Sequence, residues 1–407
     1  MKRILIIEDD RFIADVYQAK LSAEGFLVDV ASNGRSGLKQ FDLNQPDLVL
    51  VDLMLPEING VDVIRSTRAR AGNREIPIIV FSNAYLGGMV QEAWEAGASQ
   101  VLTKANCRPG QLVQAVKDAL HISSSVALPI DTAVEKQTEK ESKFIPEIST
   151  VFFRNFPQML VTLRQPMGVL GKSPQDAPSL QTLCRTVHSI AANAGLAGID
   201  PLAHMAAALE SLLKLLWEKP ERANLSTVRS IGQAIKLFED VAASPNDRVL
   251  KDPSMARVLV VDDDEFAQLA VCSALELVNL TAICADNPAS ALEELEQGHF
   301  DLIISDIEMP TADGYALCTI LRGLPTYEEI PIIFLSQHTD SDHRKESLVR
   351  GGNDFISKPF LYMELAVKAL SFVMRGTGSN RQPSTPLASL HSPWQPSHDN
   401  QLCALGV

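Results

Sequence analysis

The chain has 407 residues, of which 46% are hydrophobic and 21% are charged, a composition typical of soluble globular proteins with two or three domains. Its formal net charge of −14 leaves it without the basic balance on which nucleic-acid binding usually depends. The six cysteines form neither a C-x-x-C pair nor a zinc-finger spacing, which favours reduced thiols in the cytoplasm. No apolar stretch reaches the roughly 18 residues of a membrane span, and the apolar run near the N-terminus is too short for a signal peptide.

A repeat at a fixed offset dominates the sequence. Eight positions correspond at an offset of 254, seven with the same residue and one with a second acid: Glu8 and Asp262, Asp52 and Asp306, Pro56 and Pro310, Gly60 and Gly314, Pro77 and Pro331, Ser82 and Ser336, Gly97 and Gly351, and Lys104 and Lys358. Because the offset is constant, neither copy has a net insertion relative to the other between these positions. The simplest interpretation is two copies of one domain.

Short apolar runs alternate with amphipathic stretches in each copy. The first copy has apolar runs at 3–7, 27–31, 47–51, 76–81 and 99–103, and the second has them at 257–261, 281–285, 301–305, 330–335 and 353–357. Runs of this length, bounded by Asp, Gly, Pro or Asn, indicate strands buried on both faces, with helices between them. Each copy is therefore predicted to form a five-stranded, doubly wound parallel (βα)5 sheet with strand order 2-1-3-4-5.

The middle of the chain, 145–242, has helical periodicity without a strand signal, which predicts a four-helix bundle. The expected fold class is therefore α/β plus all-α. The expected boundaries are 1–121 for the first α/β domain, 122–144 for a linker, 145–242 for the bundle, 243–256 for a linker, 257–375 for the second α/β domain and 376–407 for a disordered tail rich in Ser, Pro and Gln.

Acidic residues follow the first and third predicted strands of each copy. Ligands of an open parallel sheet bind beyond the carboxyl ends of the strands where the strand order reverses, here between the first and third strands. Two acidic trios should therefore converge: Glu8, Asp9 and Asp52 in the first copy, and Asp262, Asp263 and Asp306 in the second. Two carboxylates about 4 Å apart repel by on the order of 4 kcal/mol at an effective dielectric of about 20, so each trio predicts a bound Mg²⁺.

A hydroxyl and an ammonium group follow the fourth and fifth predicted strands. These groups belong to Ser82 and Lys104 in the first copy and to Ser336 and Lys358 in the second. A metal, a lysine and a hydroxyl around a carboxylate are what an aspartyl phosphate needs, because phosphoryl transfer depends on positioning and on neutralising the phosphoryl oxygens. Asp52 and Asp306 are the expected nucleophiles.

This constellation resembles the receiver domain of two-component response regulators, over nearly all of both copies. DLMLPEING, which begins at Asp52, and DIEMPTADG, which begins at Asp306, carry the pattern around the family's phosphorylated aspartate. The resemblance implies that the acidic pair after the first strand binds Mg²⁺. It also implies that the backbone carbonyls of Met54 and Glu308 complete the protein ligands of the two ions.

The two copies differ at positions that the family uses for signalling. The second copy has Lys358-Pro359, which fits the family's lysine and cis proline, and Phe355 at its aromatic position. The first copy has Ala105 and Val101 there.

The middle segment resembles a histidine phosphotransfer (HPt) domain, a four-helix bundle that presents one exposed histidine from its second helix. His188 matches that histidine, with Gly198 ten residues later. Neutral imidazole is nucleophilic, and its phosphoramidate passes readily to a carboxylate held by Mg²⁺. The family usually has Lys and Gly where this chain has Ala191 and Ala192, so a bundle that only docks or dimerises stays open. His204 is expected to be an ordinary helix residue.

The preferred interpretation is a cytoplasmic phosphorelay protein with Mg²⁺ as cofactor. No ATP-binding glycine-rich motif is present, so a phosphoryl carrier is expected rather than a kinase. The expected partners are a separate sensor histidine kinase and other receiver or HPt proteins, with neither nucleic acid nor membrane. A receiver-containing scaffold that forms a homodimer, with an unphosphorylated bundle, is the open alternative.

Two other classes are disfavoured. A phosphohydrolase of the haloacid dehalogenase type would carry D-x-D-x-T/V after the first strand, and neither copy does. A helix-turn-helix output domain is disfavoured because 145–242 has nearly balanced charge and no basic stripe.

Overall fold

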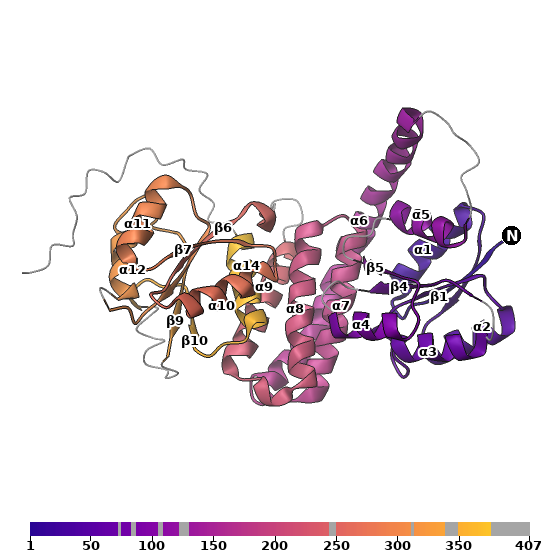
Figure 1. Cartoon of the computed structure of the whole chain (residues 1–407), viewed down its shortest axis with the longest axis horizontal. Helices are drawn as coiled ribbons and strands as arrows, with labels where there is room; N and C mark the ends of the chain where they lie inside the picture. The colour runs from indigo at the N-terminus through magenta and orange to yellow at the C-terminus, as the bar shows by residue number, and fades with distance from the viewer. Residues whose placement is uncertain are drawn as a thin grey trace, which may run out of the picture.

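The computed structural model describes residues 1–71, 75–82, 87–104, 109–121, 130–243, 250–310, 313–337 and 349–375. Two α/β domains lie on opposite sides of a helical bundle, the first drawn in indigo and the second in orange (Figure 1). The predicted tail, 376–407, lies outside the described residues, as do 122–129 and 244–249 of the predicted linkers.

The first α/β domain is built on a parallel sheet with the predicted strand order, β2-β1-β3-β4-β5. Its strands are β1 (Arg3–Ile7), β2 (Leu27–Ala31), β3 (Leu48–Val51), β4 (Ile78–Ser82) and β5 (Gln100–Thr103). Its helices are α1 (Arg11–Ala23), α2 (Gly34–Asn44), α3 (Gly60–Ala71), α4 (Gly87–Glu95) and α5 (Pro109–Ala119). Every residue of β3 and β4 is buried, which explains why these strands read as continuous aliphatic runs.

The second α/β domain repeats this topology, with the order β10-β9-β8-β6-β7. Its strands are β6 (Arg257–Val261), β7 (Thr281–Ala285), β8 (Leu302–Asp306), β9 (Ile332–Ser336) and β10 (Asp354–Ser357). Its described helices are α10 (Glu265–Glu276), α11 (Pro288–Gln297), α12 (Gly314–Arg322) and α14 (Tyr362–Arg375), preceded by the short 3-10 helix η3 (Pro253–Met255).

Four helices form the predicted bundle: α6 (Ile130–Leu170), α7 (Ala177–Leu196), α8 (Asp200–Glu218) and α9 (Leu225–Ala243), with the 3-10 turn η2 (Pro220–Arg222) before α9. Helix α6 differs from the expectation because it begins at Ile130, inside the segment 122–144 that was expected to be a linker. The reason is the composition of this segment: the polar run EKQTEKESK is rich in Glu, Lys and Gln, which favour an α-helix even in a segment without an apolar face.

Two glycines bring the loop after the third strand of each sheet back against the strand end. A Cβ on Gly60 would lie 2.1 Å from the Asp52 carbonyl oxygen, and one on Gly314 would lie 2.2 Å from that of Asp306. No L side chain fits at these positions without moving the backbone. The glycines of both repeats therefore fix the strand ends on which the candidate nucleophiles sit.

Helix α14 attaches the second α/β domain to the bundle. Its side chains belong to the same hydrophobic core as the bundle helices and the first domain. Alternate residues of the second domain's strands divide between this core and a separate one, so one face of that sheet joins the shared core. Leu365 and Leu370 are fully buried, and each such side chain contributes about 1.5–3 kcal/mol on burial. Polar contacts add to this interface: Ser226 of α9 donates to Glu364, and Arg375 donates to the carbonyl of Gln233.

Among the described helices, none is both long enough and apolar enough to cross a lipid bilayer.

A buried ion pair near this interface gives a test of the packing. Lys368 of α14 is fully buried, and its ammonium group donates to Asp354, which also accepts from Gln233 of α9. We expect Asp354→Ala to destabilise the second α/β domain by about 3–5 kcal/mol, because it leaves a buried ammonium group without its partner. Chemical denaturation of the full chain measures the shift.

The control for this test is Asp118→Ala, which removes an exposed carboxylate that accepts from Gln114 on α5. Equal unfolding midpoints for the two variants would show that the buried pair does not hold the domain.

Candidate functional site

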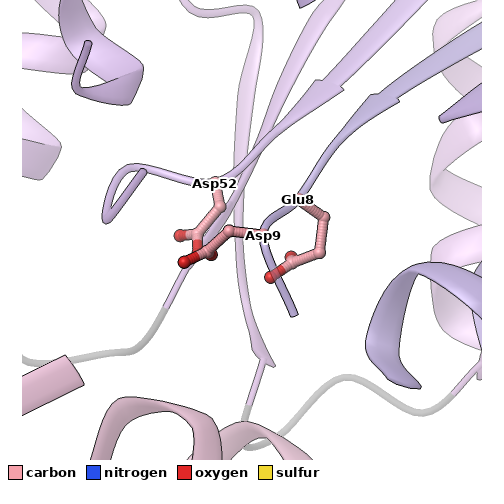
Figure 2. Close-up of side chains that lie close together, drawn as sticks. All are labelled: Glu8, Asp9 and Asp52. Carbon is pink, nitrogen blue, oxygen red and sulfur yellow. The ribbon is translucent and has the colours of Figure 1, made fainter. Parts of the chain in front are cut away.

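Three carboxylates meet at the carboxyl end of the first sheet. Glu8 follows β1, Asp9 comes next, and Asp52 follows β3, and Figure 2 shows their side chains pointing into one space. One oxygen from each lies within 4.8 Å of the others. Glu8 and Asp52 are buried and Asp9 is exposed, so the cluster opens to solvent on one side. The predicted trio is therefore assembled, because neighbouring parallel strands end at the same sheet edge.

Lys104 and Ser82 complete this cluster from the other strands. The Lys104 ammonium group lies 2.7 Å from Glu8 Oε2 and 2.7 Å from Asp52 Oδ2. Ser82 ends β4 and is buried, and its hydroxyl has no hydrogen-bond partner among the described residues. A buried, unpaired hydroxyl is unusual, and it is a ready donor to a group that enters the site.

Burial and charge shift the pKa values of these groups in opposite directions. Burial raises the pKa of Glu8 to about 8, against the opposing effect of Lys104. Burial would also raise the pKa of Asp52, but Lys104 and His188 outweigh it and hold the pKa of that carboxyl well below its usual range. Burial would lower the pKa of Lys104, but Asp52 and Glu8 raise it above its ordinary value. Asp52 is thus the carboxylate that stays ionised.

The second sheet carries the equivalent cluster in a more open form. Oxygens of Asp262, Asp263 and Asp306 lie within 4.8 Å of one another. Lys358 lies 2.7 Å from Asp262 and 3.0 Å from Asp306. Its side chain is 18% exposed, against 1% for Lys104 in the first domain. Burial raises the pKa of Asp306, although Lys358 opposes the shift.

His188 of α7 inserts into the first cluster. Its Nε2 lies 3.0 Å from Asp52 Oδ2, and its Nδ1 lies 2.7 Å from Oε1 of Glu210 on α8. Burial would lower the pKa of His188, but Glu210 and Asp52 raise it well above its ordinary value, so the ring bridges the two carboxylates as an imidazolium.

The expected exposure of this histidine is wrong. His188 does lie on the second bundle helix, as predicted, but it is 4% exposed because the first α/β domain covers it. His204, expected to be an ordinary helix residue, lies on α8.

Two contributors to this contact are absent from the sequence-based prediction. Glu210 binds the far side of the His188 ring, and Asn193 of α7 donates to Asp10 of the first domain at 3.0 Å. The sequence offers a feature that could have identified Glu210, because it is the one acidic residue in the mostly apolar stretch AALESLL. No such feature marks Asn193, because its partner Asp10 lies 183 positions away.

Oxygen-rich acidic clusters of this kind are the donor sets that Mg²⁺ prefers, and one exposed carboxylate in each leaves an approach for a hydrated ion. The carbonyl ligands predicted at Met54 and Glu308 stay predictions.

Of the positions that differ between the copies, Val101 lies on β5 and is half-buried, Phe355 on β10 is buried, and Ala105 lies outside the described residues. The Lys358-Pro359 peptide is cis, as expected.

Comparisons with known proteins agree on both repeats and on the bundle. A family model of the response regulator receiver domain matches residues 4–117 and 258–370, together more than half of the chain. A model of the Hpt domain matches residues 147–243.

Individual relatives match single segments of the chain. The transcriptional regulatory protein PrrA of Mycobacterium bovis is 33% identical over 119 residues, which are 29% of this chain and 50% of that protein. The alkaline phosphatase synthesis transcriptional regulatory protein SphR of Synechococcus elongatus is 38% identical over 111 residues, which are 25% of this chain and 42% of that protein. The chain thus spans about half the length of these relatives.

A solved structure of the chemotaxis protein CheY4 of Vibrio cholerae is 30% identical and covers 29% of this chain and 98% of its own, with a TM-score of 0.28. Both repeats match the receiver model, and the segment between them matches the Hpt model. The chain therefore belongs to the response regulator receiver family, with one receiver domain before its Hpt domain and one after it.

Proposed function

We propose that this chain is a phosphoryl carrier of a phosphorelay, in which receiver 1 (the first α/β domain) exchanges phosphoryl groups with His188 of the same chain. Asp52 and Asp306 are the phosphoryl acceptors of the two receivers. The single observation that carries the proposal is the 3.0 Å contact between His188 Nε2 and Asp52 Oδ2. It joins the predicted donor and acceptor atoms directly, which favours a working bundle over an inert scaffold.

Magnesium is the proposed cofactor of both receivers. Glu8, Asp9 and Asp52, with the Met54 carbonyl, would hold one ion, and the second copy would hold another through Asp262, Asp263, Asp306 and the Glu308 carbonyl. When bound, the ion neutralises negative charge on the carboxylates and the phosphoryl oxygens. Lys104 and Lys358 add a second positive charge beside each nucleophile, and Ser82 and Ser336 offer the hydroxyl donors.

The chemistry at the first site involves one bond broken and one formed. The bond from phosphorus to His188 Nε2 breaks and its electron pair returns to the ring, while an Asp52 oxygen forms the new bond to phosphorus. The present separation of 3.0 Å is that of a hydrogen bond, so the two side chains must draw apart to admit a phosphoryl group. In the reverse direction His188 must first lose the Nε2 proton, because an imidazolium has no free electron pair.

Glu210 is the proposed positioning residue for His188. Its carboxylate accepts from Nδ1 at 2.7 Å, which fixes the ring orientation and leaves Nε2 facing Asp52. A carboxylate that orients a catalytic imidazole in this way acts through the histidine and does not touch the phosphoryl group itself.

The phosphoryl groups are proposed to come from a separate sensor histidine kinase, with other receiver or HPt proteins as further partners. Cytoplasmic location is part of the same proposal. Support for these partners comes from the two receiver matches and the Hpt match, whose domain types exchange phosphoryl groups between histidine and aspartate.

Labelling by a small phosphodonor with Mg²⁺ tests the function. We expect label on Asp52 and Asp306 that Asp52→Ala with Asp306→Ala abolishes, and an acid-labile, base-stable phosphate that appears only when His188 is present. In Asp306→Ala protein, transfer between Asp52 and His188 should be first order and independent of protein concentration, because both groups lie in one chain.

A transfer rate that rises in proportion to protein concentration would contradict the internal route. Label that survives the double Asp change in acid-stable form would contradict the acceptors themselves.

Divalent-ion binding tests the metal sites separately from transfer. We expect calorimetry to find two bound Mg²⁺ ions per chain, and Asp9→Asn to remove one of them, because that change takes away an exposed acidic ligand without touching the buried pair. Asp15→Asn, which changes an exposed acid on α1, is the matched control and should keep both ions. Unchanged stoichiometry in Asp9→Asn would refute the assignment.

The positioning role of Glu210 predicts a specific loss. Glu210→Gln should slow transfer between His188 and Asp52 by about tenfold or more, because the amide no longer fixes the ring tautomer. Glu210→Asp should restore part of the rate, and Glu218→Gln on the exposed face of α8 should leave it unchanged. If Glu210→Gln transfers at the parent rate, Glu210 has no positioning role.

A further inference from the structure

Two cysteine side chains meet between a helix and an edge strand of receiver 2 (the second α/β domain). Cys272 lies on α10 and Cys284 lies on β7, and their Sγ atoms are 3.3 Å apart. Cys284 is exposed and Cys272 is half-buried, so small molecules in solution can reach the pair. Cys184 and Cys318 are buried instead. The pair is therefore accessible to reagents from which Cys184 and Cys318 are shielded.

The elements around the two sulfurs hold them in contact. Strand β7 pairs with β6 in one continuous register along its whole length. One turn before Cys272, Gln268 of α10 donates to the Asp262 carbonyl at 2.7 Å and to the Asp286 carboxylate at 3.0 Å. Asp262 directly follows β6, and Asp286 directly follows β7. These hydrogen bonds fix α10 against the ends of both strands and so keep the two thiols side by side.

Receiver 1 has no thiol at the equivalent place. The positions that correspond at the 254-residue offset are Gln18 on α1 and Val30 on β2, and Gln18 donates to the Val28 carbonyl at 3.3 Å. The position of Gln268 is occupied by Ala14. The repeated fold is thus built without paired thiols at this junction of helix and strand, and the pair belongs to receiver 2 alone.

The contact is close to the geometry of a disulfide bond. Because the S–S bond of a disulfide is about 2.05 Å long, the two sulfurs need to approach by only about 1.2 Å. The fold has already brought them together from positions 12 apart in the sequence, so little further ordering is needed when the bond forms. Disulfides of cytoplasmic proteins are usually transient and redox-dependent, which agrees with thiols that are reduced at rest.

We propose that Cys272 and Cys284 are a modification site, at which a small-molecule disulfide such as oxidised glutathione converts the two thiols to a reversible disulfide. The new bond ties the edge strand β7 to α10 in receiver 2 and leaves receiver 1 unchanged. The site is separate from the acidic clusters, and the proposal does not rest on the proposed function.

The conversion takes place in two exchange steps. The Cys272 thiolate attacks one sulfur of oxidised glutathione, whose S–S bond breaks, and one glutathione thiolate leaves. Cys284 then loses its proton and attacks the Cys272 sulfur, which releases the second glutathione. The two cysteine thiols are oxidised to one disulfide, and the oxidised glutathione is reduced to two glutathione thiols.

The surroundings of Cys284 set the order of these steps. Partial burial, the hydrogen bond with Cys272 and the nearby Asp286 carboxylate raise the pKa of the Cys284 thiol to about 12. Because the thiolate is the nucleophile, Cys284 attacks a disulfide in solution slowly. After Cys272 has formed the mixed disulfide, its negative charge no longer opposes the ionisation of Cys284, and the sulfur to be attacked lies beside it.

The test uses full-length protein with Cys107→Ser and Cys403→Ser, because these two cysteines lie outside the described residues. The folded protein is incubated with oxidised glutathione, and peptide mapping by mass spectrometry locates the links. We expect a link between Cys272 and Cys284 of one chain that dithiothreitol reverses, with the buried cysteines still reduced. The link should form about tenfold faster or more in folded protein than in urea-unfolded protein, because the fold holds the sulfurs in contact.

Hydrogen–deuterium exchange measures the effect of the link on the strand. Amides of β7 should exchange about tenfold more slowly in the oxidised protein than in the reduced protein, because a cross-link opposes local opening. Strand β2, the equivalent edge strand of receiver 1, is the matched control and should not change. Protein with Cys272→Ser and Cys284→Ser should show the same β7 exchange with and without oxidised glutathione.

Three results would overturn the modification site: a pair that stays reduced in folded protein under oxidised glutathione, mixed disulfides with glutathione alone, or links only between different chains. Equal rates of link formation in folded and unfolded protein would show that the fold does not position the pair. A link between Cys272 and Cys284 that leaves the exchange of β7 unchanged would overturn its role in tying the strand to α10.

Discussion

Mutual repulsion of carboxylates at the ends of β1 and β3 is the constraint on which this molecule depends. The sheet topology forces Glu8, Asp9 and Asp52 together, and burial of Glu8 and Asp52 makes negative charge there costly. Two cations relieve this cost: Lys104 comes from the same sheet, and His188 comes from a helix 136 positions away in the chain. The negative charge gathered at this sheet edge therefore also favours the contact with the histidine-bearing helix.

The same domain, used twice, is adapted to its surroundings by its last helix. On α5 of receiver 1, Gln111 and Gln114 face solvent, whereas the equivalent positions of α14 are Leu365 and Lys368, both buried. Receiver 2 is thereby joined to the bundle through a broad apolar face. Receiver 1 instead meets the bundle around its acidic cluster, where Asp52 contacts His188 and Asp10 contacts Asn193, beside apolar side chains such as Phe12.

Much of this could be predicted from the sequence because the signals are local or periodic. Strand order, the helical bundle and the convergence of the acids follow from buried aliphatic runs and from the rule that parallel strands end at one sheet edge. The extension of α6 to Ile130, before the predicted bundle, was not foreseen because EKQTEKESK offers no apolar face, and helix propensity without such a face is a weak signal. The exposure of His188 was misjudged because a domain far along the chain covers it.

The sequence by itself determined which side chains could do chemistry and which strand ends would hold them, since fixed spacing in a repeated fold leaves little freedom. Only the tertiary structure decided how the three domains are paired: His188 with Asp52, Glu210 behind the ring, and α14 in the bundle core. The physical reason is that docking of whole domains depends on the sum of many weak surface contacts between residues distant in sequence, and no local pattern records that sum.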